Sequence, residues 1–201
     1  IDRLSQIVRA LLNLAKAEGG QLALQMQDLD LVPLIREVMD ELEIPAQDRQ
    51  IHLRHQLPRR AVISADRIQI ERLLYNLIDN GIKYTRQAGF VEVIVTADPS
   101  GHKIVLEIRD NGEGIAPEHL PHLFDRFYRV PMRENGGEKG LGLGLSFVSW
   151  IVKAHGGDIQ VSSKLGEGTS FRVSFPEKIV DTRNQLEHAN QRETAGRHSN
   201  S

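Results

Sequence analysis

The hydrophobic residues of this chain recur with two periods, and the changes between them outline the predicted elements. A spacing of three or four residues, typical of helices with one buried face, occurs over 1–18, from Asp30 to Leu42, from Asp66 to Thr85 and from Leu145 to His155. Alternation with a period of two is typical of half-buried strands. It occurs over the segments 22–26, 51–57, 62–63, 90–96, 103–108, 159–161 and 170–175.

Residues that start or end helices support these bounds. Asp30 is a candidate N-cap, and Pro33 is tolerated in the first helical turn. Asp66 and Gln69 have the spacing of a capping pair at the start of the central predicted helix. The pair Gly156–Gly157 predicts the end of the last helix, because glycine readily adopts the left-handed conformation there.

The two ends of the chain differ in composition from the middle. The apolar spacing of 1–18 is heptad-like, which favours a bundle or coiled-coil helix, although a core helix of the main domain has the same pattern. Glu18-Gly19-Gly20 then interrupts the pattern like a hinge. The segment 179–201 has few apolar residues, so we expect it to be disordered. We therefore predict a main domain over 19–178.

Composition narrows the protein class. The 201 residues are 40% hydrophobic and 26% charged, which is ordinary for a soluble globular protein. A net charge of -2 favours neither nucleic acid nor an acidic membrane as partner. Without cysteine, disulfides and thiolate zinc sites are excluded. Neither a membrane-spanning segment nor a signal peptide is present, so we expect a cytoplasmic location. The chain starts inside a predicted helix without Met, as expected of a fragment.

Polar residues form a stripe on the central predicted helix. Asn76, Asn80, Lys83 and Tyr84 are spaced so that they share one face. An amide oxygen is a suitable ligand for Mg²⁺, and a lysine suits a phosphate. The stripe therefore fits a site for an anion with its counter-ion, and a solvated polar face is the alternative.

Two glycine-rich segments follow. Asp110-Asn-Gly-Glu-Gly-Ile115 places a carboxylate at the end of a strand, where it suits the amino group of a base such as adenine; an ordinary turn is the alternative. Gly140-Leu-Gly-Leu-Gly-Leu145 leads into a helix, whose N-terminal N–H groups suit an anion; a flexible loop is the alternative. Neither segment has the spacing of a P-loop or of a dinucleotide fingerprint. The chain also lacks the sequence motifs of Ser/Thr/Tyr protein kinases.

Taken in order, these motifs resemble those of one family. Between the two glycine-rich segments lies Leu123-Phe-Asp-Arg-Phe-Tyr-Arg129, and Gly166-Glu-Gly-Thr169 follows them. This order resembles the N box, first glycine box, F box, second glycine box and third glycine element of the catalytic, ATP-binding domain of bacterial sensor histidine kinases. The resemblance covers roughly Leu22 to Phe175.

The resemblance implies the Bergerat fold, an α/β two-layer sandwich with a mixed sheet covered by helices on one face. It implies ATP and Mg²⁺ as cofactors, with Asn80 as the metal ligand and Lys83 and Arg129 as catalytic residues. A larger set of positions matches the nucleotide contacts of the family. These are Asn76, Asn80, Lys83, Tyr84, Asp110, Gly112, Gly114, Ile115, Tyr128, Arg129, Gly140, Leu141, Gly142, Leu143, Gly144, Leu145 and Thr169.

The segment 116–139 matches the ATP lid of the family, and Phe124 and Phe127 are expected to pack its root onto the domain. The pair His119 and His122 has the spacing of a metal chelate, but we expect a solvated lid pair.

The family also implies partners and a phosphate acceptor. The acceptor histidine lies on a helix that precedes the one resembled by 1–18, and none of the histidines here has that sequence context. By resemblance, the full-length protein is a homodimeric, membrane-anchored sensor that passes phosphate to a response regulator. Two alternatives remain: an ATPase of the same fold, whose members carry a glutamate at the position of Asn76, or a regulatory nucleotide-binding domain without kinase activity.

Overall fold

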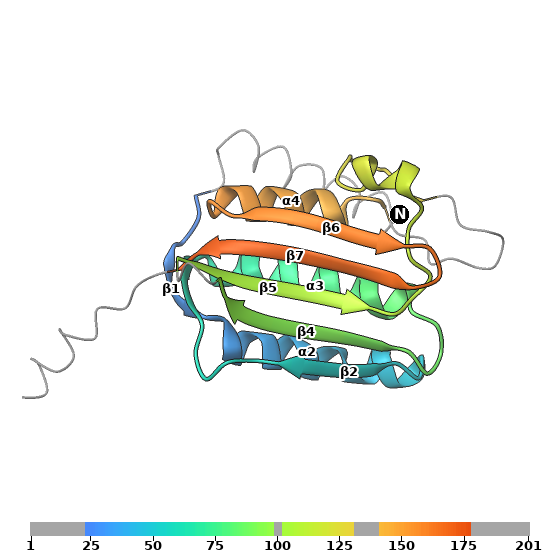
Figure 1. Cartoon of the computed structure of the whole chain (residues 1–201). Coiled ribbons are helices and arrows are strands. Elements are labelled where there is room, and N and C mark those ends of the chain that lie inside the picture. The colour runs from blue at the N-terminus through green and yellow to red at the C-terminus, as the bar shows by residue number, and fades with distance from the viewer. Residues whose placement is uncertain (1–22, 99–101, 131–140, 178–201) are drawn as a thin grey trace, which may run out of the picture.

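The computed structural model describes residues 23–98, 102–130 and 141–177 (Figure 1). They form a mixed five-stranded sheet, a separate two-stranded sheet and three α-helices, which are α2 (Leu31–Asp48), α3 (Arg67–Tyr84) and α4 (Gly144–Ala154). All three helices lie behind the five-stranded sheet in Figure 1. This arrangement confirms the predicted α/β fold with helices on one face. The predicted bundle helix 1–18 and tail 179–201 lie outside the described residues, so the domain bounds remain predictions.

The five-stranded sheet has the order β2-β4-β5-β7-β6. Strands β2 and β4 are parallel, and every other neighbouring pair is antiparallel. The strands are β2 (His52–Gln56), β4 (Phe90–Ala97), β5 (Lys103–Asp110), β6 (Asp158–Lys164) and β7 (Gly168–Pro176). The small sheet pairs β1 (Gln27–Asp30) with β3 (Val62–Ala65) in antiparallel fashion.

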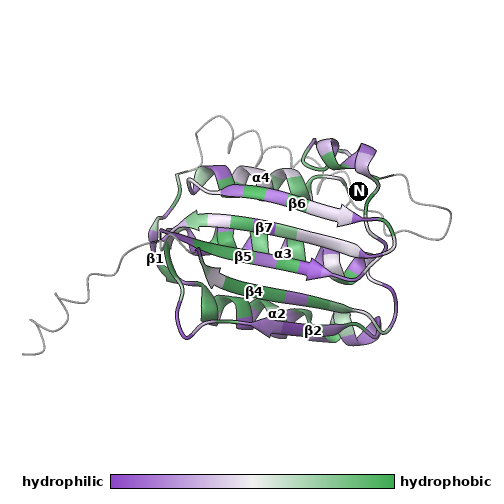
Figure 2. Cartoon of the chain, in the orientation of Figure 1, coloured by the Kyte–Doolittle hydropathy of each residue, from purple (hydrophilic) through white to green (hydrophobic). Residues whose placement is uncertain are grey.

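The core lies between the sheet and the helices. Alternate residues of β4, β5 and β7 line up across the sheet; one such row is Val93, Ile108 and Phe171, all buried. Alternation of hydrophilic and hydrophobic residues is visible along these strands in Figure 2. None of the helices within the described ranges has the length and apolar character needed to cross a membrane.

Both predicted N-caps are confirmed. Asp30 Oδ1 accepts a hydrogen bond from the Val32 N–H at 3.1 Å, and Asp66 Oδ1 accepts one from the Gln69 N–H at 3.2 Å. The reciprocal half of the second capping pair is not formed. The Asp66 N–H instead donates to Nε2 of the buried His155 at 3.0 Å, and Gln69 Oε1 is buried without a partner. His155, the C-cap residue of α4, has therefore replaced the local partner.

The strand predicted over 22–26 is wrong in position. The first strand begins at Gln27, because pairing with β3 runs from Gln27 opposite Ala65 to Asp30 opposite Val62. Met26, whose alternation suggested burial, is 47% exposed. Pairing with a distant strand therefore decided the bounds of β1, and local alternation did not.

Candidate nucleotide-binding site

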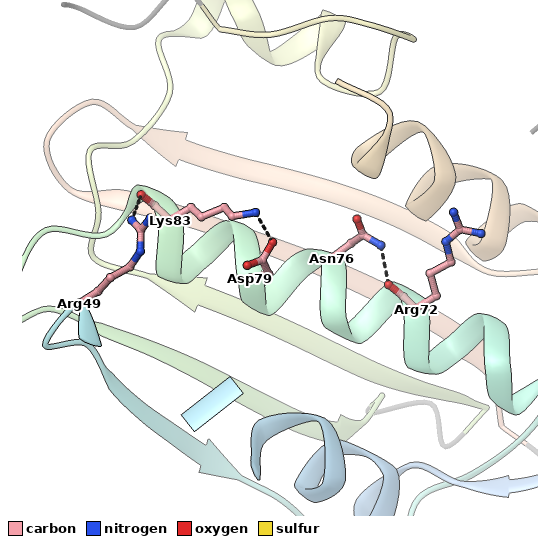
Figure 3. A network of polar contacts seen from close by, with 5 residues as sticks. All are labelled: Arg49, Arg72, Asn76, Asp79 and Lys83. Carbon is pink, nitrogen blue, oxygen red and sulfur yellow. Dashed lines mark hydrogen bonds and ion pairs between the residues drawn. The ribbon is translucent and has the colours of Figure 1, made fainter. Parts of the chain in front are cut away.

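One wall of the candidate site is the polar face of α3, shown in Figure 3. Asn76, Asn80 and Lys83 are half-buried there, whereas Tyr84 is exposed. Lys83 Nζ forms an ion pair with Asp79 Oδ2 at 2.6 Å, one helical turn away. This pair holds the ammonium group along the helix surface.

The end of β5 supplies the carboxylate. Asp110 Oδ1 accepts hydrogen bonds from the N–H groups of Gly112 at 2.8 Å and Thr169 at 3.2 Å. Within the described residues, Oδ2 of Asp110 accepts no hydrogen bond. Partial burial raises the pKa of this carboxyl group, and the two backbone hydrogen bonds oppose that rise. One oxygen is thus fixed by the protein while the other remains available to a ligand.

The loop after β5 is held against the end of α3, and this contact brings Asp110 to the helix. The Glu113 N–H donates to the Tyr84 carbonyl oxygen at 3.1 Å. A Cβ at Gly112 would lie 2.3 Å from that same oxygen, and one at Gly114, where φ is +68°, would lie 2.0 Å from the carbonyl oxygen of Lys164. Both positions therefore require glycine for close backbone approach.

Ser163 is a site residue that the sequence analysis missed. Its Oγ accepts a hydrogen bond from the Ile115 N–H at 2.8 Å and donates to the Gly168 carbonyl oxygen at 2.8 Å. Because its single hydrogen is used there, the Thr169 hydroxyl donates to Ser163 across 2.9 Å. Ser163 thus ties β6 to both segments that flank Asp110. A polar residue in the inward register of Ile159 and Val161 was the available signal.

Phe127, within the predicted lid, contacts the glycine-rich segment that follows the lid. The Phe127 N–H donates to the Gly142 carbonyl oxygen at 2.9 Å, and a Cβ at Gly142 would lie 2.7 Å from the Phe127 carbonyl carbon. Phe124 packs against the main core as predicted. The prediction for Phe127 is wrong: the residue is 52% exposed, and its backbone is left-handed, with φ of 62°.

The described part of the lid begins with the 3-10 helix η1 (Pro117–His122). The Tyr128 hydroxyl and His119 Nδ1 are 2.7 Å apart, and His122 Nδ1 lies 2.9 Å from Asp125 Oδ2. Arg129 is exposed. Gly140, which was assigned to the site, lies outside the described residues.

The N-terminus of α4 is the second wall. A Cβ at Gly144 would lie 2.7 Å from Asn76 Oδ1, so α3 and α4 approach closely at this point. The N-cap Leu143 provides no side-chain cap, and the first turn contains no acidic residue. Leu141, Leu143 and Leu145 pack in hydrophobic clusters. The positive end of α4 therefore lies beside Asn76 without an anionic cap, which suits an anionic ligand.

Comparison with known proteins identifies the family. Residues 65–179 match the family described as "Histidine kinase-, DNA gyrase B-, and HSP90-like ATPase". The chain belongs to this family. The matched range contains the polar face of α3, Asp110, the lid and Thr169, so the family's defining region and the candidate site coincide.

The chain is also similar to sensor proteins. It is 35% identical over 174 residues to the sensor protein SrrB of Staphylococcus aureus (strain NCTC 8325 / PS 47). The match covers 87% of this chain and 30% of SrrB, so the chain spans less than a third of that relative.

The solved structures that are similar to this chain include two that were crystallised as complexes. Full-length ShkA, crystallised in complex with AMPPNP, has a TM-score of 0.73 and 27% identity, covering 88% of this chain and 36% of ShkA. The histidine kinase ThkA in complex with the response regulator protein TrrA has a TM-score of 0.70 and 24% identity, covering 88% and 48%. The second likeness supports the fold alone.

Proposed function

We propose that this chain is the catalytic part of a sensor histidine kinase. It binds Mg-ATP and transfers the γ-phosphate to a histidine on a dimerisation helix outside this sequence, and a response-regulator aspartate then receives the phosphate. The single observation that carries this proposal is the half-buried carboxylate of Asp110, with one oxygen held by two backbone N–H groups and the other without a protein partner. That second oxygen is suited to accept a hydrogen bond from the amino group of adenine.

The opposite end of the site fits a magnesium triphosphate. Asn80 is half-buried, and its side chain makes no hydrogen bond within the described residues, so its amide oxygen is available as a hard ligand. The bound cation would neutralise charge on the phosphates. The N-terminus of α4 lies beside Asn76, four residues before Asn80 on the same face of α3. Adenine at Asp110 and phosphates at α4 would therefore lie along this face of the helix.

The proposed chemistry is an in-line displacement in which positioning and charge neutralisation dominate. A ring nitrogen of the acceptor histidine bonds to the γ-phosphorus, the bond to the bridging oxygen breaks, and ADP leaves with the electron pair. Lys83 and Arg129 would offset negative charge on the transferred group. Asn76 cannot accept a proton from water as a glutamate can. Its amide Nδ2 donates to the Arg72 carbonyl oxygen at 2.7 Å, which favours a positioning role and a kinase over an ATPase.

The assignment of partners rests on the relatives. We extend to this chain the kind of partner with which ThkA was crystallised, a response regulator, as the phosphate-accepting protein, and ShkA with AMPPNP supports an adenine nucleotide. We extend the proposal to a homodimer formed through bundle helices, with this domain on the cytoplasmic side of a membrane-anchored sensor.

The test combines this chain with the acceptor helix of its full-length protein and radiolabelled ATP. Acid-labile, base-stable label on that helix is the expected result, because phosphohistidine has this stability. Asn80→Ala should abolish labelling while far-UV circular dichroism stays unchanged. Phosphate release without labelling would instead establish an ATPase, and nucleotide binding without either reaction would establish a regulatory domain.

A further inference from the structure

Arg72 is a half-buried cation on α3, outside the set of residues proposed above to bind Mg-ATP. It lies on α3 one turn before Asn76, and Figure 3 shows both side chains on the same side of the helix, with Arg72 extending toward α4. Its guanidinium carbon lies 3.9 Å from the centroid of the Phe147 ring. Phe147 belongs to the first turn of α4, since its N–H donates to the Leu143 carbonyl oxygen. The guanidinium group is therefore placed at the N-terminal end of α4.

The surroundings of Arg72 contain no compensating anion. Within the described residues no carboxylate forms an ion pair with it, and the ring of Phe147 is the only partner of its guanidinium group. Burial lowers the pKa of Arg72, as expected for a cation that is partly removed from water. The stacking contact offsets only part of that cost.

Two positive features thus meet at one point. The first turn of α4 has no acidic residue and no side-chain N-cap, so its unpaired N–H groups carry partial positive charge. A guanidinium group beside this helix end is electrostatically unfavourable unless an anion binds between them. Asn76 contacts the same turn at Gly144, which connects this point to the face of α3 that carries Asn80.

We propose that Arg72 binds the terminal phosphate of the nucleotide, on the side of the site opposite Lys83. This inference rests on the proposed function, because it needs the phosphates to lie between α3 and α4. Arg72 lies eight residues before Asn80 and, of the site residues on α3, is the one farthest from Asp110. With adenine at Asp110, the terminal phosphate is the one that would reach this end of the helix, so it is favoured over the inner phosphates. Guanidinium groups bind phosphate oxygens with two parallel hydrogen bonds, so the side chain would exchange its stacking contact for a charged one.

The experiment measures the affinity of the purified chain for a non-hydrolysable ATP analogue and for ADP, by calorimetry with Mg²⁺. Arg72→Gln should weaken binding of the ATP analogue by about tenfold or more, the effect of losing a hydrogen bond to a charged group, and should change ADP binding less than twofold. Arg72→Lys should recover part of the loss, because it keeps the charge.

A matched control removes the same charge elsewhere on α3. Arg67 begins this helix and pairs with Glu37, and both side chains are well exposed. Arg67→Gln should therefore leave both affinities unchanged. Equal effects of Arg72→Gln on the two nucleotides, or no effect on either, would overturn the role of Arg72 while leaving the proposed function intact. Absence of binding to the unaltered chain would overturn both.

Discussion

Replacing Asp110 by asparagine separates the binding role of this carboxylate from its structural role. Oδ1 accepts both backbone hydrogen bonds, from Gly112 and Thr169, and the amide oxygen of asparagine can accept the same two. The oxygen without a protein partner becomes an NH₂ group. In the proposed complex this group would face the amino group of adenine, so two donors would meet where a charged acceptor was needed.

The structure indicates the size and sign of both effects. A hydrogen bond to a charged group is worth about 1.5–3 kcal/mol, so Asp110→Asn should weaken ATP binding by about 10- to 100-fold. The same substitution should raise the stability of the fold while it weakens ATP binding. Burial raises the pKa of Asp110 in the folded protein, so the folded chain holds the proton more tightly than the unfolded chain does. Ionisation of Asp110 therefore destabilises the fold as pH rises through this range, and asparagine avoids that loss.

The assay pairs calorimetry of ATP binding with thermal denaturation, each repeated across a pH series. The unaltered chain should lose ATP affinity as pH falls through the raised pKa of Asp110, because the protonated acid no longer presents a charged acceptor. The Asp110→Asn variant should show a flat profile over the same range and a higher melting temperature at neutral pH. Unchanged ATP affinity in the variant would refute the assignment of Asp110 to the adenine. A lower melting temperature would refute the argument from burial.

Two further predictions concern the sheet. Hydrogen bonding from Gln56, with that from Arg109 at 2.7 Å, lowers the pKa of Glu92, so Glu92→Gln should cost about 1 kcal/mol of stability at neutral pH. Urea denaturation should show this cost disappearing as pH falls through the lowered pKa. Gly168→Ala should cost about 2 kcal/mol or more, because φ is +114° and its Cβ would lie 2.1 Å from a backbone carbonyl oxygen of β5. Gly166→Ala, at φ +81° with nothing within 4 Å, is the control; equal losses would contradict the clash.

Local sequence was enough to predict the helices, their N-caps and the polar stripe, because these features depend on interactions between residues close together in the chain. The spacing of apolar residues placed α3 and α4 to within a few residues, because one buried stripe is enough to orient a helix against any apolar layer. The capping residues Asp30 and Asp66 marked the starts of α2 and α3. Their side chains bond to N–H groups only two or three residues away, so this signal is also local in sequence. The polar stripe from Asn76 to Tyr84 was likewise visible from helical geometry alone.

The order of the motifs predicted the family, which the match over residues 65–179 confirms. Their individual spacing did not show which residues would meet. Asp110 and Thr169 come together because β5 and β7 pair in register, with Arg109 opposite Ser170, and strand pairing across 59 positions leaves no local signal.

Tertiary packing decided the remaining features of the site. Ser163 became a connecting hydroxyl only when β6 paired with β7 and brought Ile115 within reach. The N–H of Asp66 went to His155, which is 89 residues away in sequence, although its local partner Gln69 was available. Arg72 lay on a predicted helix face, but only the approach of α4 placed it on Phe147 beside an uncapped helix end. Sequence by itself determined which side chains share an element. Contacts between distant elements depend on how those elements pack, and only the folded chain determined them.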